Sequence, residues 1–305
     1  MSLRDRTAIL AMLVVGALAS SNVDAQTAAQ DPSATTASVL WQPSMNVFRR
    51  FEVPAERMYE FYGGVLGFKQ LNTIAVGNAG GVARFQAGAQ ELKLTRRVAN
   101  RSYFGGGVRG ATGLRLLTFF FADEAQLSAR FTEHGLAAPE FKSYRGEARR
   151  SALVQDPDGQ DVELVIVRDA TAEQLARIEV GLTVADLARS REFYRQFVGL
   201  EELPPADDDR FGTRKYSFVH GATTISLRSF GKDLAVDNGS GGIQYVVSNV
   251  DFVDALAKER NVPVEQPLSG LRGFDLRTIW LGDPDGVTNY FAETGASRAA
   301  PPKAR

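Results

Sequence analysis

The 305-residue sequence contains no cysteine and only two histidines, His134 and His220. The absence of cysteine excludes disulfides, thiolate metal sites and a cysteine nucleophile. Two histidines nearly exclude a multi-histidine metal site within one chain. His134 ends a predicted helix and His220 precedes a hairpin glycine, so we expect both side chains at the surface.

Net charge is also almost absent. The chain has 35 basic and 36 acidic residues, which gives a formal net charge of −1. This balance gives no electrostatic reason to expect nucleic acid or an anionic membrane as a partner. A composition of 44% apolar and 23% charged residues is typical of globular proteins, and the length suffices for two domains.

The N-terminus carries the features of a secretory signal. Arg4 and Arg6 precede an apolar run, Ala8 to Ala19, and small residues follow at Val23-Asp24-Ala25. We expect a Sec-type signal peptide over residues 1–25 rather than a membrane anchor, because the run is too short to span a bilayer comfortably. The mature chain is then periplasmic or extracellular, with no stable membrane insertion. We expect residues 26–44 to be a flexible leader and residues 295–305 a disordered tail.

An internal duplication organises the rest of the chain. Phe61-Tyr62-Gly63-Gly64-Val65-Leu66-Gly67-Phe68 has a second copy, Phe193-Tyr194-Arg195-Gln196-Phe197-Val198-Gly199-Leu200. Each copy is followed, at a similar distance, by an Asp-Pro-Asp-Gly turn, at residues 156–159 and 283–286. An aromatic-rich helix end and a fixed turn that recur in the same order indicate two repeats, which we place at residues 45–168 and 177–294.

Each repeat is predicted to contain two units of strand, helix and three strands, an α+β organisation. In the first repeat the strand Val47–Val53 precedes a helix over Ala55–Val65, and Leu114–Phe121 precedes a helix over Glu124–His134. Each repeat is large enough for its own core, so we expect two separately folded domains joined near residues 169–176. Whether the sheets of one repeat close on themselves or pair across repeats or subunits is left open.

Two short motifs are given no function. Gly105 to Gly110 matches G-x-G-x-x-G, but a dinucleotide loop needs a strand before it and a helix after it, and here a strand follows. We therefore predict a mobile linker. Asp207-Asp208-Asp209 is predicted to be a solvated loop rather than a cation site.

The paired units, the repeated helix end and the closing turns together resemble the vicinal oxygen chelate (VOC) superfamily, which includes glyoxalase I, bleomycin-resistance proteins and extradiol dioxygenases. The resemblance implies two tandem VOC domains, each with two βαβββ units forming a curled mixed sheet around a cavity. It also implies metal-ligand positions on the first and last strands of the units, which fall here at Phe48, Lys93, Leu116, Glu163, Glu179, Ser226, Gly242 and Tyr290.

These positions are poor in metal donors. Only Glu163 and Glu179 offer carboxylates, and a catalytic metal needs about three protein ligands. We therefore predict no metal ligands and no cofactor. An ion pair of Lys93 with Glu163 in a vestigial metal position is one interpretation of the first repeat. An aromatic-walled ligand pocket is the other.

The candidate site residues follow from strand alternation. Glu179 and Tyr290 are candidates for base and acid. The candidates for ligand binding are Ser226, Arg228, Gln244, Thr183, Phe48, Arg50, Lys93 and Glu163. We place the functional cavity in the second repeat, around Glu179, Ser226, Arg228, Gln244 and Tyr290. Burial would raise the pKa of Glu179 and Arg228 would lower it, and the sequence does not decide between them.

Two classes of function remain. One is an exported glyoxalase-like protein that binds a small, partly aromatic molecule without the metal of the family. The other is a VOC-fold enzyme, either an isomerase or lyase with Glu179 or Glu163 as base, or a metal-dependent glyoxalase or dioxygenase. The sequence names neither the ligand nor the oligomeric state.

Overall fold

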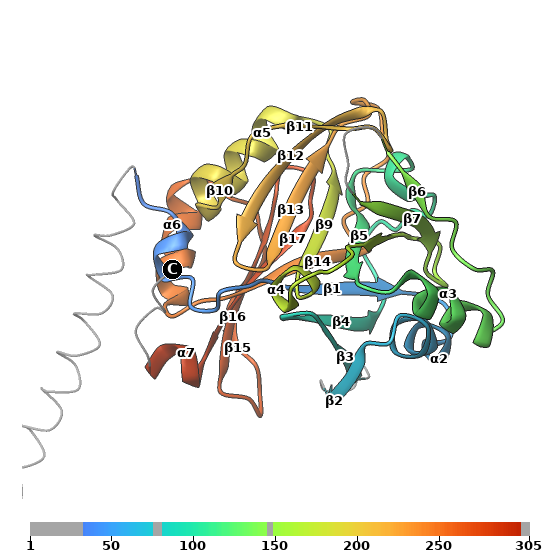
Figure 1. Cartoon of the computed structure of the whole chain (residues 1–305). Helices are drawn as coiled ribbons and strands as arrows, with labels where there is room; N and C mark the ends of the chain where they lie inside the picture. Colours follow the sequence, from blue (N-terminus) through green and yellow to red (C-terminus); the bar gives the residue numbers. More distant parts are fainter. Residues whose placement is uncertain (1–32, 76–80, 145–148, 300–305) are drawn as a thin grey trace, which may run out of the picture.

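A computed structural model describes residues 33–75, 81–144 and 149–299 (Figure 1). The predicted signal peptide lies outside the described residues. Within these three ranges, every helix is too short or too polar to cross a membrane.

The predicted α+β fold is confirmed, and nearly every expected element is present. The first repeat contains β1 (Asn46–Phe51), α2 (Ala55–Tyr59), β2 (Lys69–Ala75), β3 (Gly81–Ala87), β4 (Gln90–Arg96), β5 (Gly113–Phe121), α3 (Glu124–Glu133), β6 (Lys142–Ser143), β7 (Arg150–Gln155) and β8 (Asp161–Ile166). A short helix, α4 (Ala172–Leu175), connects the repeats.

The second repeat has the same order. It contains β9 (Ile178–Thr183), α5 (Leu187–Glu192), β10 (Glu201–Glu202), β11 (Ala206–Asp208), β12 (Thr213–His220), β13 (Thr223–Arg228), β14 (Gly241–Val246), α6 (Val250–Glu259), β15 (Val264–Gly270), β16 (Leu276–Gly282) and β17 (Thr288–Thr294). Sequence reasoning missed β15, an edge strand interrupted by Pro267 and two register shifts.

Each sheet takes one unit from each repeat. Sheet 1 has eight strands in the order β15-β16-β17-β14-β1-β4-β3-β2, and sheet 2 has nine, in the order β10-β12-β13-β9-β5-β8-β7-β6 with β11 paired to β12. Antiparallel pairs join the halves, β1 with β14 in sheet 1 and β5 with β9 in sheet 2. The repeats are tandem in sequence, but their sheets pair across repeats. This contradicts our expectation of two separately folded domains.

The duplicated motif ties the two sheets together. Both copies continue their helix as a π-helix, η2 (Glu60–Val65) and η5 (Phe193–Val198). The Tyr62 hydroxyl donates to Asp156 Oδ2 at 3.1 Å, and the Tyr194 hydroxyl donates to Asp283 Oδ2 at 2.8 Å. In each repeat the tyrosine comes from a unit in one sheet and the aspartate from a unit in the other. The helix end and the turn therefore recur together because they are bonded to each other.

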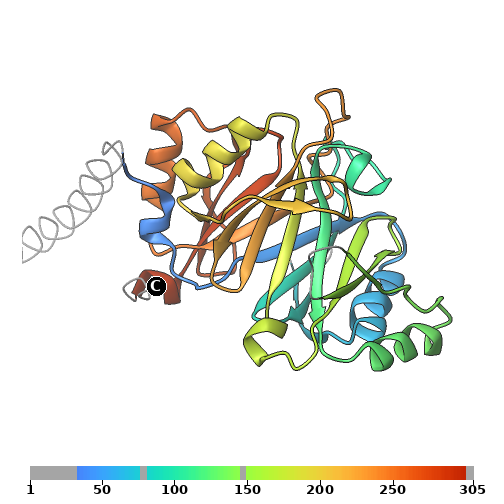
Figure 2. The same cartoon turned by 45° about the horizontal axis from the view of Figure 1, so that its top comes forward.

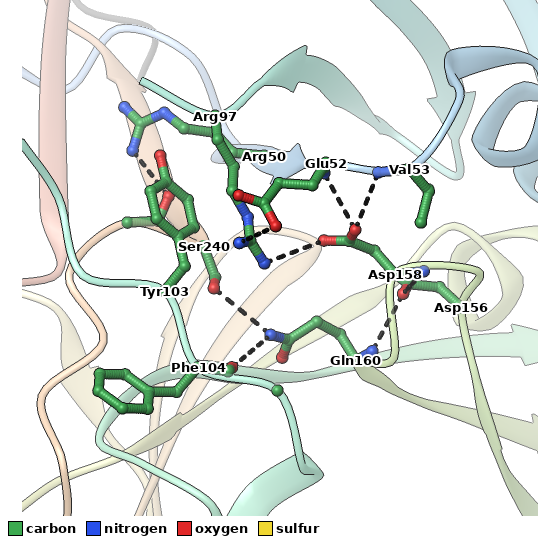
Figure 3. A network of polar contacts seen from close by, with 12 residues as sticks. Arg50, Glu52, Val53, Arg97, Tyr103, Phe104, Asp156, Asp158, Gln160 and Ser240 are labelled. Atoms are coloured by element: carbon green, nitrogen blue, oxygen red, sulfur yellow. Dashed lines mark hydrogen bonds and ion pairs between the residues drawn. The ribbon is translucent and has the colours of Figure 1, made fainter. Parts of the chain in front are cut away.

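The first turn also holds the start of α2 (Figure 3). Asp158 Oδ1 accepts the backbone N–H groups of Glu52 and Val53, at 3.0 and 3.2 Å. Arg97 forms ion pairs with Glu52 and, at 3.6 Å, with Asp158. Residues that are about a hundred positions apart in the chain thus fix the connection between β1 and α2.

One hydrophobic core extends through both repeats. Figures 1 and 2 show the helices of the first repeat together at one end of the molecule and those of the second repeat at the other. Residues in the core include Phe61 and Phe131 from one end and Phe197 and Leu256 from the other. A continuous core again argues that the repeats stabilise each other.

Three expectations about irregular segments are corrected. Residues 33–44, expected to be flexible, include a short 3-10 helix, η1 (Thr36–Val39), in which Thr36 and Ala37 are buried and Thr36 Oγ1 donates to the Val198 carbonyl at 3.1 Å. The expected disordered tail begins with a helix, α7 (Gly295–Ala299), and its remainder lies outside the described residues. The glycine-rich stretch is not a free linker, because the buried Arg115 guanidinium donates to the carbonyls of Gly105 and Gly107, both at 3.0 Å.

The shared sheets give a first prediction. Fragments 33–170 and 171–299, each expressed alone, should not yield folded monomers, because each leaves two strands without their antiparallel partners. Co-expressed, they should purify as a one-to-one complex. Size-exclusion chromatography and circular dichroism check this, and a stable folded monomer of either fragment would contradict it.

Candidate functional site

The expected metal positions meet in two places, one on each sheet. On sheet 1, Phe48 pairs with Lys93 and Gln244 pairs with Tyr290. On sheet 2, Thr118 pairs with both Glu163 and Glu179. Both places combine residues from the two repeats, because they lie at the strand pairs where the repeats join.

The cavity that we placed in the second repeat is therefore divided. Glu179, Ser226 and Arg228 lie on sheet 2, whereas Gln244 and Tyr290 lie on sheet 1. Glu179 and Tyr290 consequently do not form the expected base and acid pair. The sequence pattern gave the correct face of each strand but not the partner strand.

A cavity of about 310 Å³ lies over sheet 1, and we call it the sheet-1 pocket. Its lining includes five predicted site residues, Phe48, Arg50, Lys93, Gln244 and Tyr290. The other lining residues are Ile74, Val82, Thr95, Val98, Gln266, Ser269, Gly270, Leu271, Phe274, Leu276, Thr278 and Trp280. Sequence reasoning did not select Trp280, although Leu276, Thr278 and Trp280 alternate along β16 as one face of a strand should.

Lys93 lies half-buried where strands of the two repeats pair. Its Nζ donates to Gln244 Oε1 at 2.5 Å, and Glu91 Oε2 lies 3.7 Å away. Burial lowers the pKa of Lys93, while the charge of Glu91 opposes this effect. The proposed ion pair of Lys93 with Glu163 does not form, because Glu163 belongs to sheet 2.

Aromatic rings form the walls of the sheet-1 pocket. The Phe48 ring lies where a Cβ on Gly242 would be, so only glycine fits opposite it. Trp280 and Tyr290 meet edge to face, with ring centroids 5.3 Å apart. Burial raises the pKa of Tyr290 to about 12, so its hydroxyl stays protonated at neutral pH. These rings offer a partly apolar surface with hydrogen-bonding groups at its edge.

On sheet 2 the first carboxylate is fully compensated by neighbouring groups. Glu179 Oε1 accepts from Ser226 Oγ at 2.5 Å and from Lys215 Nζ and Arg228 Nη2, both at 3.2 Å. Burial would raise the pKa of Glu179, but the two cations and the Ser226 hydrogen bond outweigh it and lower the pKa to about 2. A carboxylate with so low a pKa is a weak base at neutral pH.

The second carboxylate of sheet 2 is covered by a loop. Glu163 accepts from Arg210 Nε at 2.9 Å and from Thr118 Oγ1 at 3.2 Å. Burial and the nearby Glu179 charge raise the pKa of Glu163. Arg210 follows β11 in the chain, so this loop places a guanidinium beside the carboxylate.

Two polar residues on the same face of sheet 2 have structural contacts. Asp208 is buried and pairs with Arg228 Nε at 2.7 Å, so the prediction of a fully solvated aspartate triplet is wrong at this residue. Thr183, a predicted ligand-binding residue, is buried and donates from Oγ1 to the Val108 carbonyl at 2.6 Å.

Neither the residues on sheet 1 nor those on sheet 2 fit a divalent metal. Sheet 1 presents an ammonium, an amide, a neutral phenol and a phenyl ring, and sheet 2 presents two carboxylates already neutralised by Lys215, Arg228 and Arg210. Within the described ranges no three His, Asp or Glu side chains group as metal ligands do. His134 contacts Glu60 and His220 contacts the Gln42 carbonyl, away from both places.

Paired βαβββ units whose first and last strands face a cavity define the class of protein. The pattern of the Glyoxalase/Bleomycin resistance protein/Dioxygenase superfamily matches residues 53–164 and 174–291. The chain therefore belongs to this superfamily, with two tandem copies of its domain, and it is a glyoxalase-like protein. No curated protein matches the sequence.

Solved structures share this fold at low identity. Glyoxalase I from Zea mays is 20% identical, with a TM-score of 0.63 over 82% of this chain and 92% of that one. A mutant of the same enzyme gives a TM-score of 0.67 at 19% identity, over 84% and 94% of the two chains. A putative dioxygenase from Bacillus subtilis gives 0.58 at 13% identity, over 86% and 87%. At these identities the likeness concerns the fold alone.

The low pKa of Glu179 gives a second prediction. Its folded-state pKa of about 2 lies below the ordinary 4.5, so its contribution to the free energy of unfolding is present above pH 4.5 and is lost as pH falls towards 2. Glu179→Gln should cost roughly 3 kcal/mol at pH 7 and less than half of that at pH 3. Urea unfolding of both proteins between these pH values measures the difference.

Glu163→Gln is the matched control for this experiment. Because the pKa of Glu163 is raised in the folded state, its ionised form opposes folding as pH rises. The difference between wild type and this variant should therefore change with pH in the opposite direction. A Glu179→Gln variant with the same pH dependence as wild type would overturn the assignment of Glu179 as an ionised, compensated group.

Proposed function

We propose that this protein is an exported, glyoxalase-like binding protein that holds a small, partly aromatic molecule in the sheet-1 pocket without the metal of the family. The observation that carries the proposal is the pocket itself. It occupies the place where the family resemblance puts a metal, and it has aromatic walls and hydrogen-bonding groups in place of metal ligands. Its volume of about 310 Å³ is at the lower end for small-molecule sites.

The binding interpretation is favoured over an isomerase or lyase by the state of the two carboxylates. Glu179 and Glu163 both lie on sheet 2, and neither lines the sheet-1 pocket. Each is already bonded to cationic side chains of the protein. A general base must reach the substrate proton through a free oxygen, and Glu179 in addition is too weakly basic.

Loss of one rim side chain should weaken binding. Phe274 lines the pocket and is 44% exposed, so Phe274→Ser removes apolar contact without emptying the core. Phe104→Ser is a matched control, because Phe104 is 41% exposed and does not line the pocket. With 3-phenylpropionate and 3-phenylpropionamide as probes, we expect Phe274→Ser to raise Kd by about tenfold, as loss of a partly buried phenyl ring predicts.

Isothermal titration calorimetry with the three proteins measures these constants. The Phe104→Ser protein should bind as wild type does. If neither probe binds wild type, or if both variants weaken binding equally, the sheet-1 pocket is not the binding site. Mass spectrometry of denatured protein purified from its native host identifies a co-purified ligand directly.

The export part of the proposal rests on the N-terminal sequence. Arg4 and Arg6 with the apolar run and Val23-Asp24-Ala25 favour cleavage after Ala25. N-terminal sequencing of the protein from a periplasmic or secreted fraction should begin at Gln26. An intact Met1 on a membrane-bound product would contradict export as a cleaved protein.

A further inference from the structure

The structure buries four arginines within its described residues, and they differ in one respect. Arg49, Arg50, Arg115 and Arg228 are each at most 3% exposed. Arg49 pairs with Asp156, Arg115 with Asp237, and Arg228 with Glu179 and Asp208. Arg50 alone has no carboxylate within 4.0 Å among the described residues. A buried cation without a counter-ion lowers the stability of the folded protein, so a bound anion would compensate it.

Acidic residues near Arg50 are already engaged elsewhere. Glu265 and Asp237 are the carboxylates whose charges act on Arg50. Both oxygens of Glu265 accept from Arg101, at 2.9 and 2.8 Å, and Asp237 lies 2.7 Å from Arg115. Arg97, drawn close to Arg50 in Figure 3, is paired with Glu52 and Asp158. The surrounding protein therefore does not supply the missing negative charge.

The guanidinium of Arg50 faces the sheet-1 pocket with donors to spare. Nη1 donates to the Gly239 carbonyl at 3.0 Å, which leaves Nε and Nη2 without a protein acceptor. Neither nitrogen is among the sealed atoms without partners, so solvent or a ligand reaches them. The Arg50 Cζ lies 4.8 Å from the centroid of the Phe48 ring and 6.0 Å from that of Trp280, which fixes the charge among aromatic walls.

Lys93 and Trp280 also line the pocket. Trp280 Nε1 has no hydrogen-bond partner in the protein, but it is sealed from solvent, so a ligand in the pocket reaches the ring of Trp280 and not its N–H. Lys93 is the second cation of the lining, and Glu91, its nearest carboxylate, also pairs with Arg84. The lining formed by described residues contains Arg50 and Lys93 and no Asp or Glu. The described lining thus carries two cations and no carboxylate, which makes the pocket positive.

We infer that the ligand of the sheet-1 pocket is an anion, an aromatic carboxylate whose acid group accepts from the Arg50 guanidinium while its ring lies among Phe48, Trp280 and Tyr290. This inference rests on the proposed function and adds the charge and the orientation of the ligand. A planar carboxylate matches the fork of a guanidinium, which binds it through two parallel N–H groups. The ammonium of Lys93 is the second cationic donor of the lining.

The test compares two ligands of the same shape, one with an anionic, acceptor-only end group and one with a neutral amide. At pH 7.5, 3-phenylpropionate is ionised, whereas 3-phenylpropionamide has the same ring and chain and is neutral. Wild type should bind the acid at least tenfold more tightly than the amide. Trp280 reports the position of the ligand, because the chain has two tryptophans and Trp41→Phe leaves Trp280 as the only fluorophore of its kind. Both probes should change its emission.

Arg50→Met isolates the contribution of the guanidinium. It should weaken binding of the acid at least tenfold and change binding of the amide less than threefold. Its melting temperature should be unchanged or higher, because no ion pair is lost. Arg97→Met is the matched control, since that arginine is paired within the protein and does not line the pocket, and it should keep the preference for the acid.

The outcomes distinguish failure of the anion inference from failure of the proposed binding function. Equal binding of acid and amide by wild type overturns the anion inference and leaves the binding function standing. Failure of both probes to bind overturns the binding function as well. If Arg50→Met keeps the preference for the acid and Lys93→Met loses it, then Arg50 is not the anchor and the inference as stated is wrong. The comparison of probes on wild type decides the matter even if a variant does not fold.

Discussion

Backbone hydrogen bonds between β1 and β14, and between β5 and β9, hold this molecule in one piece. Without them sheet 1 would be two separate halves of four strands each, and sheet 2 would be one half of five strands and one of four, all with exposed edges. Because the pairs are antiparallel and central, they also set which side chains stand beside each other at the two junctions. Lys93 meets Gln244, and Thr118 meets Glu179, only through these pairs. Tyr62 and Tyr194 then fix the sheets to one another through the two turns.

Each sheet has one junction, the strand pair at which the two repeats meet. The two junctions differ in how their charged side chains are compensated. At the sheet-2 junction, two carboxylates face Lys215, Arg210 and Arg228, and Asp208 supplies a further carboxylate to Arg228. The charges there are satisfied within the protein, which suits a filled, structural position. At the sheet-1 junction, Arg50 and Lys93 line an open pocket in which the described residues place no acid. Of two equivalent places in the scaffold, one therefore presents unpaired positive charge to a pocket, and the other pairs its carboxylates with cations of the protein.

Much of the fold could be predicted from the sequence because hydrophobic alternation and turn residues are local signals. The helix predicted over Ala55–Val65 is formed by α2 and η2 together, and α3 begins at the predicted Glu124. The faces of the strands were also predictable, so Phe48, Arg50, Lys93, Gln244 and Tyr290 all reach the pocket. Strand partnership was not predictable, because a repeated pattern fits pairing within a repeat as well as pairing between repeats. For this reason Glu179 was expected near Tyr290 and Lys93 near Glu163, although the two members of each pair lie on different sheets.

The exchange of units between sheets has a consequence for the order in which the chain can fold during synthesis. β1 is made early, yet one of its two neighbours, β14, begins only at Gly241. Contacts so distant along the chain form slowly, since a long loop must close before they form. Sheet 1 cannot close until most of the polypeptide has left the ribosome, and until then one edge of β1 remains open to other chains. Late closure of this kind exposes the unfinished chain to aggregation through pairing of β1 with strands of other molecules.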